Sequence, residues 1–60
     1  MKKNELIKMK LKEKLMTVRE LADLIEINEV SMSRYLSGDR AMSDELADRC
    51  LKVIEEVNNG

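Results

Sequence analysis

The sequence predicts an all-α fold, a compact single domain of four helices, or five, that spans residues 1–60. Proline is absent and glycine occurs only at Gly38 and Gly60, so few positions would interrupt a helix. Most of the remaining residues are good helix formers, namely leucine, isoleucine, methionine, alanine, glutamate, lysine and arginine. A chain of 60 residues is long enough for one small domain only.

Two helices are indicated in the first part of the chain. Apolar residues at a spacing of three to four, with lysines between them, predict a helix over residues 2–15. These apolar residues are Leu6, Ile7, Leu11 and Leu15. Thr17 is a favourable N-cap, and Glu20 three residues later completes a capping box, so a second helix is expected over about 18–25. The inward face of this second helix is predicted to contain Leu21, Ala22, Leu24 and Ile25.

A third helix is expected over about 29–36. Asn28 is a candidate N-cap, and Glu29 in the first turn complements the helix dipole. Gly38 stands where a residue in the left-handed conformation would end the helix. The side that packs inward would contain Met32, Tyr35 and Leu36. The opposite side would contain Glu29, Val30, Ser33, Arg34 and Ser37.

A fourth helix is expected over about 44–57. Ser43 is its candidate N-cap, with Asp44 and Glu45 in the first turn, where acidic side chains are favourable. Its apolar stripe is predicted to contain Leu46, Cys50, Val53 or Ile54, and Val57, with Leu51 alongside. Cys50 is therefore interpreted as a small core residue.

The composition argues against several classes of function. One cysteine cannot form a disulfide within the chain, and without histidine it cannot build a zinc site. No paired-carboxylate or nucleophile constellation is present, so we expect neither an enzyme nor a cofactor, a metal or a small-molecule substrate. No apolar run approaches the roughly 20 residues of a membrane span, and the basic start has no apolar core of a secretory signal. We therefore expect a cytoplasmic protein without a membrane partner.

Charge is distributed unevenly, although the formal net charge is only −1. Residues 1–19 hold seven basic and two acidic residues, a local charge of +5. Residues 20–60 hold four basic and ten acidic residues, a local charge of −6. The basic segment has two interpretations that the sequence leaves open, a solvated helix face or a flank that faces phosphates.

The predicted helices 18–25 and 29–36 form the most informative pair in the chain. Each is too short to be stable alone, and a joint of about three residues implies a fixed crossing angle held by shared core contacts. That is the geometry of a helix-turn-helix. The segment TVRELADLIEINEVSMSRYLSG, residues 17–38, resembles the helix-turn-helix of the Cro and phage-repressor (XRE-type) family. The matching positions are Thr17, the Leu21–Ala22 pair, Ile25, Ile27, Met32, Tyr35 and Gly38.

The resemblance implies a lambda-repressor-like DNA-binding domain that serves as a sequence-specific transcriptional regulator of phage or mobile-element type. Helix 29–36 would lie in the major groove of a double-stranded operator, and Arg34 would donate to guanine O6 and N7 while Val30 meets a thymine methyl. The residues that match base-contacting positions are Asn28, Glu29, Val30, Ser33 and Arg34. Those that match phosphate-contacting positions are Thr17, Arg19, Ser37 and Arg40. The N-terminus of helix 18–25 would also direct amides at a phosphate.

Relatives of this type dimerise on two half-sites about one helical turn apart, so a homodimer is expected. Val53, Ile54 and Val57 lie near the end of the fourth helix, and four short helices are not expected to cover all three. They are therefore predicted to supply a partner surface.

Two residues depart from the family pattern. The family usually has glycine where this chain has Glu26, at the end of the first motif helix, and a left-handed glutamate there would cost roughly 1 kcal/mol unless the turn is built differently. Glu29 places an acid where the recognition helix should meet DNA. A carboxylate repels phosphate, but it can accept a hydrogen bond from cytosine N4.

A protein-interaction module with the same fold, such as an antitoxin, an anti-repressor or another inhibitor, is the alternative function, because residues 20–60 are acidic. Several candidate contacts also have purely structural interpretations. Asn28 would only cap its helix, and Ser37 would only satisfy helix carbonyls. Arg40 would pair with Asp39 or Asp44 in solvent. Arg19 would be part of the ordinary helix surface, and Val30 would belong to a small interface. Tyr35 would lie in the core with its hydroxyl at the edge.

Overall fold

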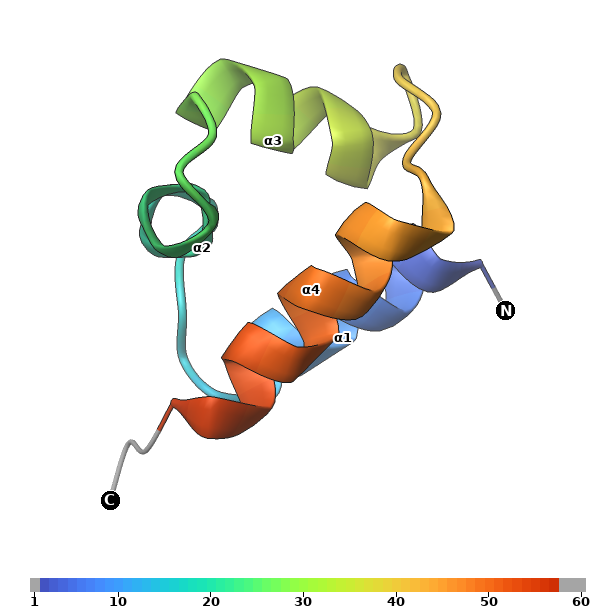
Figure 1. Cartoon of the computed structure of the whole chain (residues 1–60). Helices are drawn as coiled ribbons and strands as arrows, with labels where there is room; N and C mark the ends of the chain where they lie inside the picture. Colours follow the sequence, from blue (N-terminus) through green and yellow to red (C-terminus); the bar gives the residue numbers. More distant parts are fainter. Residues whose placement is uncertain (1, 58–60) are drawn as a thin grey trace.

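Four α-helices and no strands make up residues 2–57, the part of the chain that the computed structural model describes (Figure 1). The helices are α1 (Lys3–Glu13), α2 (Val18–Ile25), α3 (Glu29–Ser37) and α4 (Asp44–Glu56). The predicted all-α class is confirmed with four helices, and the described chain is compact, with a Cα radius of gyration of 10.3 Å. Within residues 2–57, no helix combines the length and the apolar character that a membrane crossing requires.

The helices close a ring around one core. α1 packs against α4 and α3, and α2 packs against the same two helices. In Figure 1, α1 and α4 run side by side, and α3 lies above them along the top of the view. α2, at the left, packs against both α3 and α4. One side of α3 is therefore held by α1 and α2, and the other side is left uncovered by the described residues.

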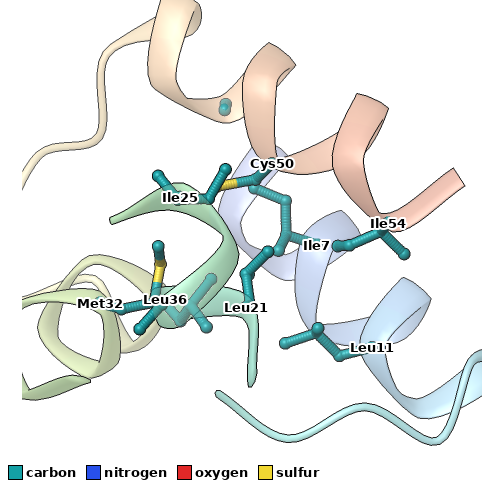
Figure 2. Packing of buried hydrophobic residues seen from close by; sticks show 10 residues of the cluster. Ile7, Leu11, Leu21, Ile25, Met32, Leu36, Cys50 and Ile54 are labelled. Carbon is teal, nitrogen blue, oxygen red and sulfur yellow. The ribbon is translucent and has the colours of Figure 1, made fainter. Parts of the chain in front are cut away.

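Apolar side chains from all four helices fill the core (Figure 2). Figure 2 shows Leu21 of α2 near Ile7 and Leu11 of α1, in the core that all four helices share. The predicted inward positions are confirmed at most sites. The buried residues are Ile7, Leu11, Leu21, Ala22, Ile25, Met32, Leu36, Ala47, Cys50 and Ile54.

Two residues that were predicted to be buried are exposed, and one buried residue was not predicted. Leu24 is 52% exposed, because Leu21, Ala22 and Ile25 already form the buried stripe of the short helix α2 and Leu24 lies off this stripe. Leu15 is 87% exposed, because α1 ends at Glu13 and the chain turns away before this residue. Ala47 is buried, although alanine gives little hydrophobic signal in a sequence.

Cys50 is a core residue, as predicted. Its side chain is fully buried, and burial raises the pKa of the thiol above its ordinary value, with a smaller opposing effect of Arg49. The thiolate form that reacts with electrophiles is therefore disfavoured in the folded protein.

Local capping interactions fix three of the helix starts at the predicted residues. Thr17 Oγ1 accepts from the Glu20 amide at 3.1 Å, and Glu20 Oε1 accepts from the Thr17 amide at 3.0 Å, which completes the capping box. Asn28 Oδ1 accepts from the Val30 amide at 2.7 Å. Ser43 Oγ caps α4 by accepting from the Leu46 amide at 3.1 Å. Because each contact spans two or three residues, short-range sequence signals were sufficient to predict it.

Left-handed residues follow the first three helices. Gly38 after α3 has a φ of 93°, as predicted, but Leu15 and Glu26 have φ values of 56° and 65° without being glycine. After α2, the Glu26 amide donates to the Asp23 carbonyl at 3.3 Å and the Ile27 amide donates to the Ala22 carbonyl at 2.9 Å. This pair of bonds is a Schellman motif. The chain therefore makes the turn between α2 and α3 with a left-handed glutamate.

Replacing Glu26 by glycine is expected to raise the free energy of unfolding by about 0.5 to 1 kcal/mol. Glycine removes a steric cost of about 1–2 kcal/mol and loses about 0.5–1 kcal/mol through backbone entropy. Asp23→Gly is a matched control, because it removes the same charge from an exposed position inside α2, and it should cost about 0.3 kcal/mol through the lower helix propensity of glycine. Urea unfolding compares the two variants with the wild type. A Glu26→Gly variant less stable than wild type would contradict the expected relief of strain.

Polar contacts tie both ends of α1 to the rest of the domain. Lys3 Nζ lies 3.4 Å from Asp44 and 3.3 Å from Asp48 of α4, and the hydrogen bond to Asp48 is the main cause that raises the pKa of Lys3. Lys14 Nζ donates to the Val57 carbonyl at 3.2 Å. Asn4 Nδ2 donates to the Leu36 carbonyl at 3.1 Å, which connects the first turn of α1 to the last turn of α3.

Candidate nucleic-acid interface on α3

The two sides of α3 have opposite characters. Met32 and Leu36 are buried, whereas Val30, four residues before Arg34 on the other side, is 59% exposed. We use the name outward face of α3 for its exposed residues, which are Glu29, Val30, Ser33, Arg34 and Ser37. The helix thus brings together four of the five predicted base-contacting residues on one accessible surface, with Asn28 at its N-terminal end.

Asn28 has one half of its amide already engaged. Its Oδ1 accepts from the Val30 amide at 2.7 Å, so the structural interpretation of Asn28 as an N-cap is confirmed. The Nδ2 group can still donate to an acceptor on a base or a phosphate. A paired donor and acceptor contact with adenine needs the oxygen as well, and this would break the cap.

The hydroxyl groups at the ends of the α2–α3 unit differ in what they can still donate. Ser37 Oγ donates to the Arg34 carbonyl at 3.1 Å, and its single proton is therefore not available to a phosphate oxygen in this rotamer. Thr17 Oγ1 instead accepts from the Glu20 amide, so its proton remains free to be donated outward. Of these two predicted phosphate-contacting hydroxyls, only Thr17 has a geometry that is ready for the contact.

The N-terminus of α2 is partly closed by its own capping box. The amides of Thr17 and Glu20 are engaged with side chains, and the Leu21 amide donates to the Thr17 carbonyl at 3.2 Å. The amides of Val18 and Arg19 remain available to an anion. The Glu20 carboxylate stands beside them, so the positive end of the helix dipole is partly compensated within the chain.

The predicted alternative for Arg40, an ion pair with Asp39 or Asp44, is absent from residues 2–57. Asp44 is instead paired with Lys3. The guanidinium of Arg40 lies over the Tyr35 ring, with its carbon 5.4 Å from the ring centroid, and Nη1 lies 3.5 Å from Ser31 Oγ. The Arg40 amide also donates to the Arg34 carbonyl at 3.2 Å. The loop after α3 therefore folds back along the helix.

Tyr35 and Ser31 are half-buried and sit four residues apart at the border between the buried side and the outward face of α3. Tyr35 was expected in the core with its hydroxyl at the edge, but it is only half-buried and lies outside the buried core cluster. Neither residue was predicted to belong to the candidate site, because their contact with Arg40 depends on the path of the loop after Gly38. The i and i+4 spacing of Ser31 and Tyr35 was the only signal present in the sequence.

An open pocket of about 340 Å³ lies where the start of α1, the end of α3 and the loop before α4 meet. Tyr35 and Arg40 line it from one side, and Lys2, which precedes α1, and Asn4 of α1 line it from the other. Lys2 thereby joins Arg40 on the same side of the molecule.

The surface around α2 and α3 is slightly acidic. Residues 17–40 contain three basic residues, all arginine, and five acidic residues. The arginines are Arg19, Arg34 and Arg40. The acidic residues are Glu20, Asp23, Glu26, Glu29 and Asp39. Any attraction of phosphates to this surface must therefore come from the placement of three side chains, because the local net charge does not supply it.

Most lysines of α1 lie away from the outward face of α3, because α1 packs against α3 from the core side (Figure 1). Lys3 and Lys14 contact α4 and the residue that follows it, and Lys10 lies 3.7 Å from Glu13 of its own helix. Lys8 and Lys12 are exposed on the outer side of α1. The basic segment, residues 1–19, was expected to be either a solvated helix face or a flank that faces phosphates. For the lysines of α1 after its first residues, this arrangement favours a solvated helix face.

The chain was also compared with protein-family models, with curated proteins and with solved structures, and none of the three comparisons found a match. Within residues 2–57, no group of three or more histidine, cysteine or acidic side chains is placed to hold a metal ion.

Proposed function

We propose that this chain is a sequence-specific DNA-binding transcriptional regulator of phage or mobile-element type, with α2 and α3 as a helix-turn-helix and α3 in the major groove. The observation that carries the proposal is the outward face of α3. It presents a guanidinium, hydroxyls, a carboxylate and methyl groups on a helix whose opposite side is anchored by Met32 and Leu36. The compact joint between α2 and α3 adds support, because a Schellman motif at Glu26 fixes their relative direction.

The exposed groups on this face other than Ser37 have chemical partners among base edges. Arg34 lies in the last turn of α3 and is assigned to guanine, whose O6 and N7 accept two hydrogen bonds. Val30 is assigned to a thymine methyl and Glu29 to the N4 group of cytosine. Ser33 can donate or accept, and Asn28 retains its amide hydrogens for an acceptor.

Phosphate contacts are assigned to the two ends of the α2–α3 unit. At the first end, the Thr17 hydroxyl, the Val18 and Arg19 amides and the Arg19 side chain are available. At the second end, Arg40 is the cation, and Ser37 would contribute only after its hydroxyl releases the Arg34 carbonyl. With two cationic phosphate contacts per copy, from Arg19 and Arg40, log K should fall with log salt concentration with a slope of about −2.

Two copies on adjacent half-sites would double these contacts, and a homodimer is part of the proposal. The predicted partner surface needs one correction, since Ile54 is fully buried in its own domain. Val53 and Val57 are only half-buried and remain as candidates for contact between copies.

Amide chemical shifts of ¹⁵N-labelled protein, titrated with a random-sequence DNA duplex of about 20 base pairs, test the proposal. We expect the largest changes at residues 17–19 and 28–40, and we expect them to shrink as salt rises, because phosphate contacts release counterions. Changes confined to Lys8, Lys12 and their neighbours on α1 would contradict the assignment of α3. An absence of changes at low salt would contradict DNA binding itself.

A protein-interaction module is the second candidate function, and the observation in its favour is the excess of acidic residues around α2 and α3. In this case the outward face of α3 would contact a basic protein surface. The same titration separates the two candidates, because this module should leave the amide shifts of α3 unchanged by duplex DNA.

A further inference from the structure

The side of α3 that carries Ser31 and Tyr35, which we name the Tyr35 flank, has a basic group held against it. Arg40 reaches this flank from the loop after Gly38 through three contacts. Its amide donates to the Arg34 carbonyl at 3.2 Å, its guanidinium lies 5.4 Å from the Tyr35 centroid, and Nη1 lies 3.5 Å from Ser31 Oγ. The first contact fixes the backbone of Arg40, and the other two fix its side chain.

The position of this flank determines what Arg40 can meet. A helix in the major groove points its outward face at base edges, and its flanks face the walls of the groove, which are made of phosphates. Arg40 lies beside α3, next to the outward face and not beyond the end of the helix. Its guanidinium would therefore stand at the groove wall while Arg34 stands at the groove floor.

We propose that Tyr35 is a positioning residue that holds Arg40 against α3 for contact with a DNA phosphate, an inference that rests on the proposed function. The electron-rich face of an aromatic ring attracts a guanidinium without neutralising its charge, in contrast to a carboxylate. An ion pair with Asp39 or Asp44 would consume the positive charge, and Asp44 is engaged with Lys3 instead. Tyr35 thus orders the cation and leaves it free for an anion.

A double-mutant cycle in duplex binding tests this role. The variants are Tyr35→Leu, which removes the ring, Arg40→Gln, which removes the charge, and the combination of both. The probe is a fluorescein-labelled random-sequence duplex of about 20 base pairs, and the readouts are the affinity and its salt dependence by fluorescence anisotropy. We expect each single variant to bind about 2- to 5-fold more weakly than wild type and to lower the salt slope by about 1.

The combination is expected to bind no more weakly than Arg40→Gln alone, because the ring acts only through this arginine. Tyr35→Phe retains an aromatic face and should restore wild-type affinity and salt slope. Arg49→Gln removes an exposed arginine from α4 and should leave the affinity within about 2-fold of wild type and the salt slope unchanged. Additive losses in the cycle, or an unchanged salt slope in Tyr35→Leu, would overturn the positioning role.

Side-chain proton shifts of Arg40 in the free protein provide a second readout that does not depend on the Tyr35→Leu variant being folded. Ring currents should move these protons upfield in wild type and in Tyr35→Phe, and shifts of an unstructured arginine in wild type would overturn the inference. Failure of the proposed function looks different, because wild type would then fail to bind the duplex at low salt although the ring-current shifts are present. That result would also remove the phosphate contact assigned to Arg40.

Discussion

Arg34→Ala is expected to abolish the preference of the protein for its best DNA site while weakening binding to unrelated sequences only slightly. Arg34 is exposed on the outward face of α3, and no ion pair engages it within residues 2–57. A bidentate contact with guanine contributes about 1–3 kcal/mol of discrimination, so affinity for the preferred site should fall about 5- to 150-fold. Competition gel shifts with preferred and unrelated duplexes measure the ratio.

Arg19→Ala is the matched control for this experiment. It removes the same charge from an exposed position at the start of α2, where the assigned partner is a phosphate. A phosphate contact carries no sequence information, so this variant should weaken binding to all duplexes by a similar factor and lower the salt slope by about 1. Equal losses on every sequence for Arg34→Ala as well would contradict direct base recognition by Arg34.

Leu21→Ala is expected to have the largest effect on stability. Leu21 is fully buried in the core that all four helices share, near Ile7 and Leu11, so its truncation leaves a cavity there (Figure 2). Such truncations cost about 2–5 kcal/mol, whereas a domain of 60 residues has a total stability of roughly 3–9 kcal/mol. We expect a variant that is largely unfolded, or unfolds at much lower urea concentration, by circular dichroism.

Leu24→Ala provides a control with the same chemical change on the same helix. Leu24 is 52% exposed, and a truncation there should alter the free energy of unfolding by no more than about 0.5 kcal/mol. Similar losses for Leu21→Ala and Leu24→Ala would contradict the orientation of α2 described above.

The features that the sequence predicts correctly depend on contacts between near neighbours. Thr17, Asn28 and Ser43 each cap the helix that starts immediately after them, and Gly38 ends α3 in the left-handed conformation that glycine adopts easily. Met32 and Leu36 of α3 and Cys50 of α4 follow the same logic, because the spacing of apolar residues predicts that they are buried.

Features that depend on distant segments were not predictable. Asn4 donates to the Leu36 carbonyl 32 residues away, and no local pattern links the two. The partner of Arg40 depended on a loop path, which placed it over Tyr35 and not beside an acid. Leu24 was misassigned because a short helix offers two neighbouring apolar stripes, and packing against α3 and α4 selects only one of them.

Selection of bound sites from a pool of random double-stranded DNA, with wild type and Arg34→Ala in parallel, is the sharpest test of α3 as a DNA recognition helix. We expect wild type to enrich a short consensus that contains a guanine, and we expect the requirement for this guanine to disappear in Arg34→Ala. A palindrome with half-sites about 10 base pairs apart would identify two bound copies. A wild-type protein that enriches no sequence over the starting pool would contradict the assignment of α3 as a DNA recognition helix.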